Sequence, residues 1–269
     1  MDSDFPPAEH GPGPAPVIET RGITKSFGHV QALRGASLRA YPGEVLALIG
    51  DNGAGKSTLS NVIAGVHAAD AGELVLRGET VNVSSVRHAR ELGIEIVYQD
   101  LAQAPDLTVV QNFFFGRELL VTGPGRFIGQ VDEPTMRERT KQAMSLLGAQ
   151  VPSLTAPVSA LSGGQRQAIA VARAVMWATA AIVMDEPTAA LGTKQTKMVY
   201  DAVRAAADRD LAVIFVSHDI PKMLDFADRI AIMRHGQVVA QMPTAGLQLV
   251  DVLTTMLSAK SDAAQGEAA

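Results

Sequence analysis

The chain has 269 residues, a net charge of −5 and no cysteine, so disulfides, thiolate chemistry and cysteine zinc sites are excluded. No block of lysine and arginine indicates a nucleic-acid partner, and the six histidines lack the paired spacing of a structural metal site. No run of about 18 apolar residues predicts a membrane-spanning helix. The length allows one large domain or two modest ones.

The first half of the chain combines a proline-rich start with a series of short strands. Residues 1–16 are acidic and proline-rich, which predicts a disordered tail and not a secretory signal. A helix is expected over Thr58–Ala64, and strands are expected at Val17–Thr20, Val45–Gly50, Glu73–Leu76 and Ile94–Tyr98. From about residue 100 to 160 the pattern changes and predicts a helical insertion, with one helix from Met136 to Leu147 that Gly148 could end.

The second half alternates helices with continuous apolar strands, which is typical of parallel sheets buried on both faces. Helices are expected at Arg166–Trp177 and Thr193–Ala207, strands at Ala181–Asp185 and Leu211–Ser217, and a hairpin at Arg229–Arg234 and Gln237–Gln241. Residues 259–269 are polar and alanine-rich, so we expect a flexible tail. The whole pattern predicts an α/β fold with a helical insertion.

The most specific motif is the segment Gly50–Ser57, here named the phosphate loop, which has the pattern G-x-x-x-x-G-K-S between a strand and a helix. Its glycines let backbone N–H groups converge on phosphate oxygens, and the helix N-terminus adds donors and partial positive charge. Lys56 can reach the β- and γ-phosphates, and Ser57 can offer its hydroxyl to Mg²⁺. The motif predicts a nucleoside triphosphate site; the alternative is a chance glycine-rich turn.

Polar residues also end two of the expected buried strands. Asp185 and Glu186 follow one strand, at the sheet edge where the phosphate loop of such folds lies. Asp185 would hold Mg²⁺, through water, and Glu186 could take a proton from an attacking water. His218 ends the next strand and could contact the γ-phosphate. The alternatives are a solvated acid pair and an ordinary polar histidine.

Two further motifs complete the set. The segment Leu161–Gln165, here named the signature segment, opens a helix with Ser162 and two glycines, which predicts a second anion-binding helix start; the alternative is a plain N-cap. Gln99 ends the strand from Ile94 to Tyr98. Its amide could join the metal or the water, or it could be a surface amide.

In this order, the motifs resemble those of the ATP-binding cassette (ABC) family of transporter ATPases, over about residues 17–250. The phosphate loop is similar to the family's Walker A loop, Gln99 to its Q-loop glutamine and the signature segment to LSGGQ. Ile182–Glu186 is similar to Walker B with its catalytic glutamate, and His218 to the switch histidine. The resemblance implies a P-loop NTPase cassette of residues 17–258, with a RecA-like core, an antiparallel β subdomain and an inserted helical subdomain at about 100–160.

The resemblance also implies residue roles, with ATP and Mg²⁺ as cofactors. Phe27 falls where the family has an adenine-stacking aromatic, although a core aromatic is the alternative. Glu186, His218 and Gln99 are the expected catalytic residues, and Ser57, Gln99 and Asp185 are the expected metal ligands. The expected nucleotide-binding residues are Phe27, Gly50, Asn52, Gly53, Gly55, Lys56, Ser57, Thr58, Ser162, Gly163, Gly164 and Gln165.

In the family, two cassettes face head to tail, and each ATP lies between one Walker A loop and the partner's signature. This chain holds one set of motifs, so the resemblance implies a second cassette, most simply another copy. One departure is Gly192, which stands where the family usually has an aspartate that crosses the dimer interface. We therefore do not transfer that role.

The segment Asp51–Gly55 and the run Ala189–Gly192 resemble the cassettes of binding-protein-dependent monosaccharide importers of the ribose, xylose and fructose type. The resemblance implies an ATPase subunit at the cytoplasmic face of the inner membrane, with transmembrane permease subunits, an indirect periplasmic binding protein and no nucleic acid as partners. Gln99 and the stretch Leu101–Gly116 would link to the permease, and the run Phe113–Phe115 could dock a partner or pack in a core. The alternatives are a soluble ABC ATPase that acts on DNA or ribosomes, and a degenerate regulatory module.

Overall fold

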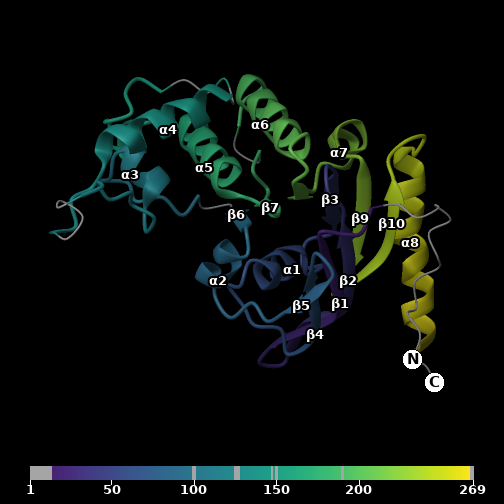
Figure 1. Ribbon diagram of the computed structural model, residues 1–269. Helices are drawn as coiled ribbons and strands as arrows, with labels where there is room; N and C mark the ends of the chain where they lie inside the picture. Colours follow the sequence, from purple (N-terminus) through teal and green to yellow (C-terminus); the bar gives the residue numbers. More distant parts are fainter. Residues whose placement is uncertain are drawn as a thin grey trace.

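A computed structural model describes residues 14–98, 101–123, 128–146, 148, 151–188 and 191–266, with side chains as far as residue 258. Two sheets form its framework, and helices lie on both faces of the larger one (Figure 1). The strands are β1 (Ile18–Phe27), β2 (Val30–Ala40), β3 (Val45–Gly50), β4 (Ala71–Leu76), β5 (Glu79–Val81), β6 (Ile94–Val97), β7 (Ala181–Asp185), β8 (Ala212–Val216), β9 (Arg229–Arg234) and β10 (Gln237–Pro243).

The helices lie between and after these strands in the chain. They are α1 (Lys56–Ile63), α2 (Val86–Glu91), α3 (Val109–Phe114), α4 (Glu133–Leu146), the 3₁₀ turn η2 (Val158–Ala160), α5 (Gly163–Trp177), α6 (Thr193–Ala207), α7 (Ile220–Phe226) and α8 (Leu249–Gly266). In the part of the chain that the structure describes, no helix is both long and apolar enough to cross a bilayer.

The larger sheet has six strands in the order β10-β9-β3-β8-β7-β6. Strands β9, β3, β8, β7 and β6 are parallel, and β10 returns antiparallel beside β9. Every residue of β3, β7 and β8 is buried, as expected for apolar strands covered on both faces. The carboxyl ends of the parallel strands meet at one edge, which brings the phosphate loop and the strand-end acids together.

The smaller sheet is antiparallel, with the order β2-β1-β4-β5. Its longest strand, β2, is absent from the sequence-based expectations. Its apolar positions Leu33, Ala36, Leu38 and Ala40 are buried, but a register shift between Ile23 and Thr24 of β1 interrupts the pairing. This sheet is the antiparallel β subdomain that the family resemblance implies.

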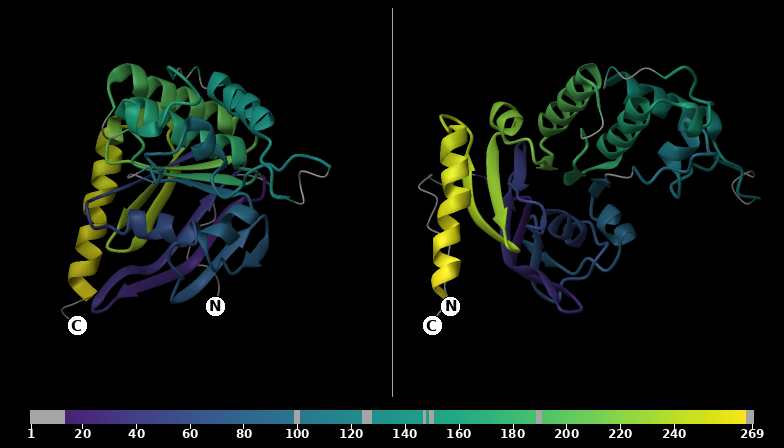
Figure 2. Two further views of the ribbon diagram at one scale, coloured as in Figure 1. Left: turned by 90° about the vertical axis from the view of Figure 1, so that its left-hand side faces the viewer. Right: turned by 180° about the vertical axis from the view of Figure 1, so that it is seen from behind.

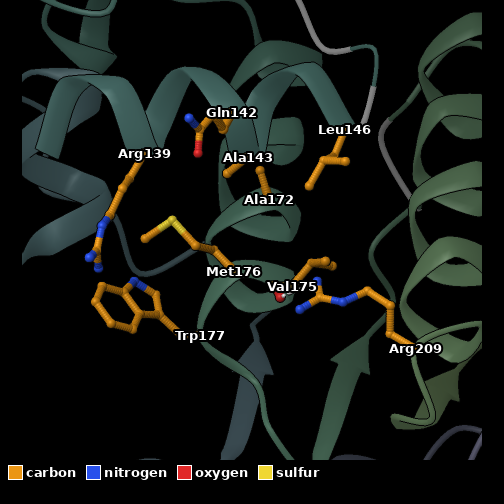
Figure 3. Close-up of a pocket in the computed structure, with 9 residues that line it drawn as sticks. All are labelled: Arg139, Gln142, Ala143, Leu146, Ala172, Val175, Met176, Trp177 and Arg209. Atoms are coloured by element: carbon orange, nitrogen blue, oxygen red, sulfur yellow. Dashed lines mark hydrogen bonds between the residues drawn. The ribbon is translucent and has the colours of Figure 1, made fainter. Parts of the chain in front are cut away.

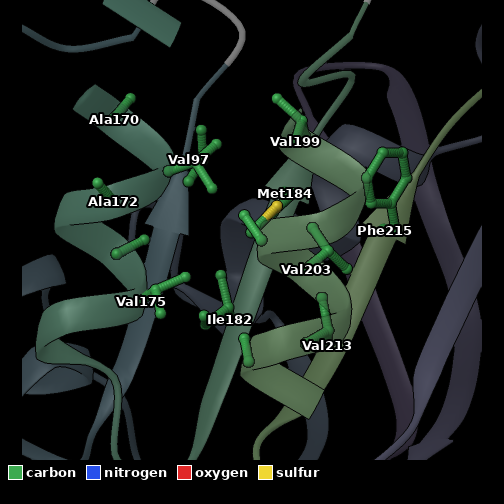
Figure 4. Packing of buried hydrophobic residues seen from close by; sticks show 14 of the residues in the cluster. Val97, Ala170, Ala172, Val175, Ile182, Met184, Val199, Val203, Val213 and Phe215 are labelled. Carbon is green, nitrogen blue, oxygen red and sulfur yellow. The ribbon is translucent and has the colours of Figure 1, made fainter. Parts of the chain in front are cut away.

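The six-stranded sheet separates two hydrophobic cores, because alternate side chains of its strands point to opposite faces. One face packs against α3 to α8, and the other packs against α1, α2 and the antiparallel sheet. Figure 4 shows the part of the first core between the sheet and helices α5 and α6. On β3, for example, Ala47 belongs to the first core and Leu46 to the second.

The helical insertion contains α3 and α4 and lies at the opposite end of the molecule from α8 (Figures 1 and 2). Phe113 and Phe114 are core residues of this part, whereas Phe115 is 61% exposed. Two of the three phenylalanines therefore pack in the core, as the alternative interpretation of that run expected. The buried Asn112 donates from Nδ2 to the carbonyls of Ala104, Leu107 and Thr108, and fixes the loop before α3.

Several boundaries differ from the sequence-based expectations. The bounds of β3, β7 and β9 agree, but α1 and α5 begin at Lys56 and Gly163, earlier than expected. Helix α8 continues to Gly266, past residue 258 where we expected the flexible tail to begin. Residues 1–13 of the tail expected at 1–16, and the last three residues, lie outside the described part of the chain.

Candidate active site

The phosphate loop bends at two glycines, Gly50 and Gly55, where a Cβ atom would clash with neighbouring backbone. Gly50 has φ of 155°, and a Cβ atom there would lie 2.1 Å from the carbonyl oxygen of Met233. Gly55, the residue before α1, has φ of 102°, and its Cβ would lie 2.6 Å from the carbonyl oxygen of Ala32. The backbone can therefore approach a ligand closely, and the N–H groups of the first turn of α1 are free of a side-chain cap.

A distant turn supports this loop. The backbone N–H of Gly236, in the turn between β9 and β10, donates to the carbonyl of Ala54 at 2.9 Å, and the carbonyl of Gly236 accepts from the N–H of Arg34 at 2.8 Å. The phosphate loop, the β9–β10 turn and strand β2 are thus fixed to one another. The sequence predicted the turn but contains no signal for this contact.

Lys56 is 7% exposed, and its ammonium donates to the carbonyls of Gly50 at 2.8 Å and Asp51 at 3.0 Å. Burial lowers the pKa of Lys56, while the negative charges of Glu186 and Asp185 act in the opposite direction. A cation enclosed in this way can bind phosphate oxygens strongly, because little water competes for it.

Asp185 ends β7 and is 9% exposed. Its Oδ1 atom is buried and has no hydrogen-bond partner among the described residues. Burial raises the pKa of Asp185, and the hydrogen bond from the Ser57 hydroxyl opposes that shift. A buried carboxylate with an unused oxygen, beside a hydroxyl, fits a hard cation such as Mg²⁺ that also binds water and phosphate. The described residues contain no group of three or more acidic or histidine ligands, so an ion here would depend on the nucleotide for further oxygens.

Glu186 and His218 form a side-chain pair at the same sheet edge. Nδ1 of His218 lies 3.2 Å from Oε1 of Glu186, and the backbone N–H of Glu186 donates to the carbonyl of Val216 at 3.1 Å. Glu186 has φ of 46°, in the left-handed region that non-glycine residues rarely adopt. Such strained residues are concentrated at functional sites, since the surrounding structure must hold them there.

The signature segment lies at the start of α5, where Ser162 is the N-cap. The Ser162 hydroxyl accepts from the N–H of Gln165 at 3.3 Å, and Oε1 of Gln165 accepts from the N–H of Ser162 at 3.0 Å. Both side chains thus form a capping box, which is the plain N-cap interpretation. Gly163 and Gly164 are the first two helical residues, so a second anion-binding role for this segment stays a prediction.

Phe27 is not a core residue, because its side chain is 44% exposed. It pairs with Val30 at the β1–β2 hairpin, and its ring meets His67 edge-on at 5.1 Å. Two residues after that hairpin turn, Ala32 lies against Gly55 of the phosphate loop. The ring is therefore exposed beside a hairpin whose second strand touches the phosphate loop, and stacking of a base on it stays a prediction.

The remaining site residues are placed as follows. Asn52 and Gly53 form the exposed turn of the phosphate loop, and Thr58 lies in the first turn of α1. Gln99 and the pair Ala189-Ala190 lie outside the described residues, so the role of Gln99 in catalysis and metal binding stays a prediction. Gly192 is exposed at the N-cap of α6 and provides no side-chain cap.

A cavity of about 300 Å³ lies elsewhere, between α4, α5 and the end of α6 (Figure 3). Its walls include Arg139, Met176, Trp177 and Arg209. None of the expected site residues lines it, so the cavity is not the nucleotide site.

The chain is similar to known proteins along most of its length. Residues 33–189 match the family model described as ABC transporter. The chain is 39% identical over 247 residues to the fructose import ATP-binding protein FrcA of Rhizobium meliloti, covering 91% of this chain and 95% of that protein. It is 40% identical over 242 residues to the xylose/arabinose import ATP-binding protein XylG of Sulfolobus acidocaldarius, covering 90% and 94%.

Its fold is similar to a solved structure, the ADP conformation of MJ1267, an ATP-binding cassette of an ABC transporter. The TM-score is 0.74 and the identity 26%, with 90% of this chain and 94% of that chain covered. Together with the parallel and antiparallel sheets described above, this similarity confirms the predicted fold class.

Proposed function

Because this chain belongs to the ABC transporter family, whose cassettes are ATPases that bind nucleotide, we propose that it is the ATP-hydrolysing subunit of an importer for a simple sugar. The observation that carries the sugar assignment is the identity of about two residues in five, over nearly full length, to two proteins named for the import of fructose and of xylose or arabinose. Shared ancestry with these importers supports the substrate class, because the cassette itself provides no path for a sugar.

The hydrolytic step is assigned to the edge of the six-stranded sheet. The N–H groups of the phosphate loop and the Lys56 ammonium bind the β- and γ-phosphates of ATP. Glu186 accepts a proton from a water molecule while the water oxygen forms a bond to the γ-phosphorus. The bond between that phosphorus and the β–γ bridging oxygen breaks, and ADP and inorganic phosphate result.

His218 orients this base. Its Nδ1 atom lies 3.2 Å from Oε1 of Glu186, so the second carboxylate oxygen can turn toward the water. The left-handed backbone of Glu186 fixes where that carboxylate stands. Asp185 and Ser57 would hold Mg²⁺, which supplies positive charge against the phosphate oxygens when it is bound.

Partners complete the proposed assembly. The signature segment of a second cassette, most simply another copy of this chain, would cover the γ-phosphate, and ATP binding would close the two copies. Transmembrane permease subunits would hold the pair at the cytoplasmic face of the inner membrane. A periplasmic binding protein would deliver the sugar to those subunits.

Uptake measurements test the substrate class apart from the ATPase activity. Deletion of the gene should abolish uptake of one labelled pentose or hexose, and the gene carrying Glu186→Gln should fail to restore it. Uptake of amino acids and peptides should not change. Normal uptake of every sugar in the panel, together with loss of another nutrient, would refute the sugar assignment and leave the ATPase assignment intact.

A further inference from the structure

The loop that follows β6 contacts the chain on both sides of the signature segment. On the N-terminal side, the N–H of Ser159 donates to the carbonyl of Pro105 at 2.9 Å, and the N–H of Val158 donates to the carbonyl of Leu107 at 3.0 Å. On the C-terminal side, Nε2 of Gln103 donates to the carbonyl of Arg166 at 2.7 Å. One short loop therefore holds both flanks of the signature segment.

The Gln103 contact differs from the other two, because a side chain makes it. Gln103 lies four residues after Gln99, and its Oε1 atom is buried with no hydrogen-bond partner among the described residues. The amide is thus enclosed and directed by its single bond to α5. A buried acceptor left without a hydrogen-bond partner costs free energy of folding, so stability alone does not explain why a glutamine stands at position 103.

The backbone just before Gln103 is strained. Leu101 has φ of 57° and Ala102 has φ of 43°, two successive left-handed residues with side chains. The N–H of Leu101 donates to the carbonyl of Tyr98 at 3.0 Å, and its side chain packs against the core of the insertion. Strain of this kind persists where surrounding contacts enforce it, and here those contacts direct Gln103 toward α5.

We infer that Gln103 is a positioning residue, which transmits the position of the loop after β6 to the first turn of α5 and so sets the orientation of the signature segment. The inference rests on the proposed role of that segment in binding the nucleotide of a second cassette. Among the described residues, the hydrogen bond that the side chain of Gln103 donates joins it to Arg166, one residue after the signature segment, so its effect on that segment would pass through α5. The backbone bonds of Pro105 and Leu107 remain in any side-chain variant, so only the Arg166 flank would be released.

The test uses two variants that remove the donor and keep the length of the side chain, Gln103→Glu and Gln103→Met. Gln130→Glu is the matched control, because Gln130 is exposed in the same insertion. Each variant is examined for ATP turnover as it stands, and for MgATP-dependent dimerisation in a Glu186→Gln background by light scattering. Binding of MgADP to the monomer is measured by calorimetry, and the melting temperature reports on folding.

Both Gln103 variants should lower turnover and raise the dimer dissociation constant by about 2- to 13-fold, the factor that one net hydrogen bond represents. The affinity of the monomer for MgADP should not change, because the phosphate loop of the same chain contacts the phosphates of ADP. A parallel loss of MgADP affinity, or unchanged turnover and dimerisation in both variants, overturns the inference. If Glu186→Gln alone stays monomeric, the proposed dimer fails instead, and the turnover of the Gln103 variants still decides the role of Gln103.

Discussion

Substitution of Glu186 by glutamine removes the proposed general base and changes little else. Glutamine has nearly the same volume, and its Oε1 atom can accept from Nδ1 of His218 as the carboxylate does over 3.2 Å. The left-handed backbone, at φ of 46°, costs about 1–2 kcal/mol for either side chain, so this cost cancels. We therefore expect a stable protein that binds ATP and hydrolyses it slowly.

The expected loss follows from the step that is removed. A positioned general base contributes about 10²–10⁴ in rate, which corresponds to about 2.7–5.4 kcal/mol of barrier. Contacts to the phosphates come from the phosphate loop and Lys56, which the substitution leaves in place. Turnover should fall by that factor. The affinity for ATP should stay within about twofold of the wild type, because the contacts that bind ground-state ATP are unchanged.

Steady-state phosphate release measures turnover, and calorimetry measures ATP affinity. Glu79→Gln is the matched control, because Glu79 is exposed on β5 and distant in the fold from the sheet edge. The melting temperature of Glu186→Gln should stay within about 2–4 °C of the wild type, which represents about 1 kcal/mol for a chain of this size. Turnover within about threefold of the wild type would assign the base to another group.

Further substitutions test the rest of the site. Phe27→Ala should weaken ATP binding, measured by calorimetry, by about 1–3 kcal/mol, because the stacking of the base is lost. The melting temperature should not change, because the ring is 44% exposed. A lower melting temperature with unchanged ATP affinity would contradict this prediction. Gly50→Ala should lower the unfolding free energy in urea by about 1–3 kcal/mol or more, since its Cβ would meet the backbone of Met233. Gly163→Ala, whose Cβ would have no atom within 4 Å, should change it by less than about 1 kcal/mol, and equal losses would show that backbone contact is not decisive. Burial lowers the pKa of Lys56 in the free protein, and bound phosphates should raise that pKa, so ATP binding should take up protons at pH values between the two. The binding enthalpy measured by calorimetry in this pH range should therefore depend on the ionisation enthalpy of the buffer. A buffer-independent enthalpy would place Lys56 away from the phosphates.

The buried strands and the strand-end motifs could be predicted from the sequence because their signals are local. Apolar runs such as Val45–Gly50 and Ala181–Asp185 end at a glycine or an acid, and the structure gives the same bounds. Parallel strands end at one edge, so the sequence predicted Glu186 and His218 at the same sheet edge, whereas their 3.2 Å contact comes from the structure.

Other features were not predicted, because their local signal is weak or because they depend on contacts between distant segments. The N-terminal glycines of α5 have low helix propensity, but the Ser162 and Gln165 capping box makes them helical from Gly163. The bond between Gly236 and Ala54 joins positions far apart in the chain and has no local signature. Strand β2 was missed for the same reason, since its register beside β1 is irregular and its burial depends on the rest of the sheet.

The division of the cassette into two cores has a consequence for its evolution. Ile182 and Val183 are neighbours on β7, yet Ile182 packs with the helices behind the signature segment and Val183 packs with the layer that carries α1. Because the two side chains point to opposite faces of the sheet, a cavity made at Ile182 lies in the core that contains Val203 of α6, and a cavity made at Val183 lies in the core that contains α1. Compensation for a change at Ile182 is therefore expected from residues such as Val203, which lie in another segment of the chain, and not from Val183 beside it.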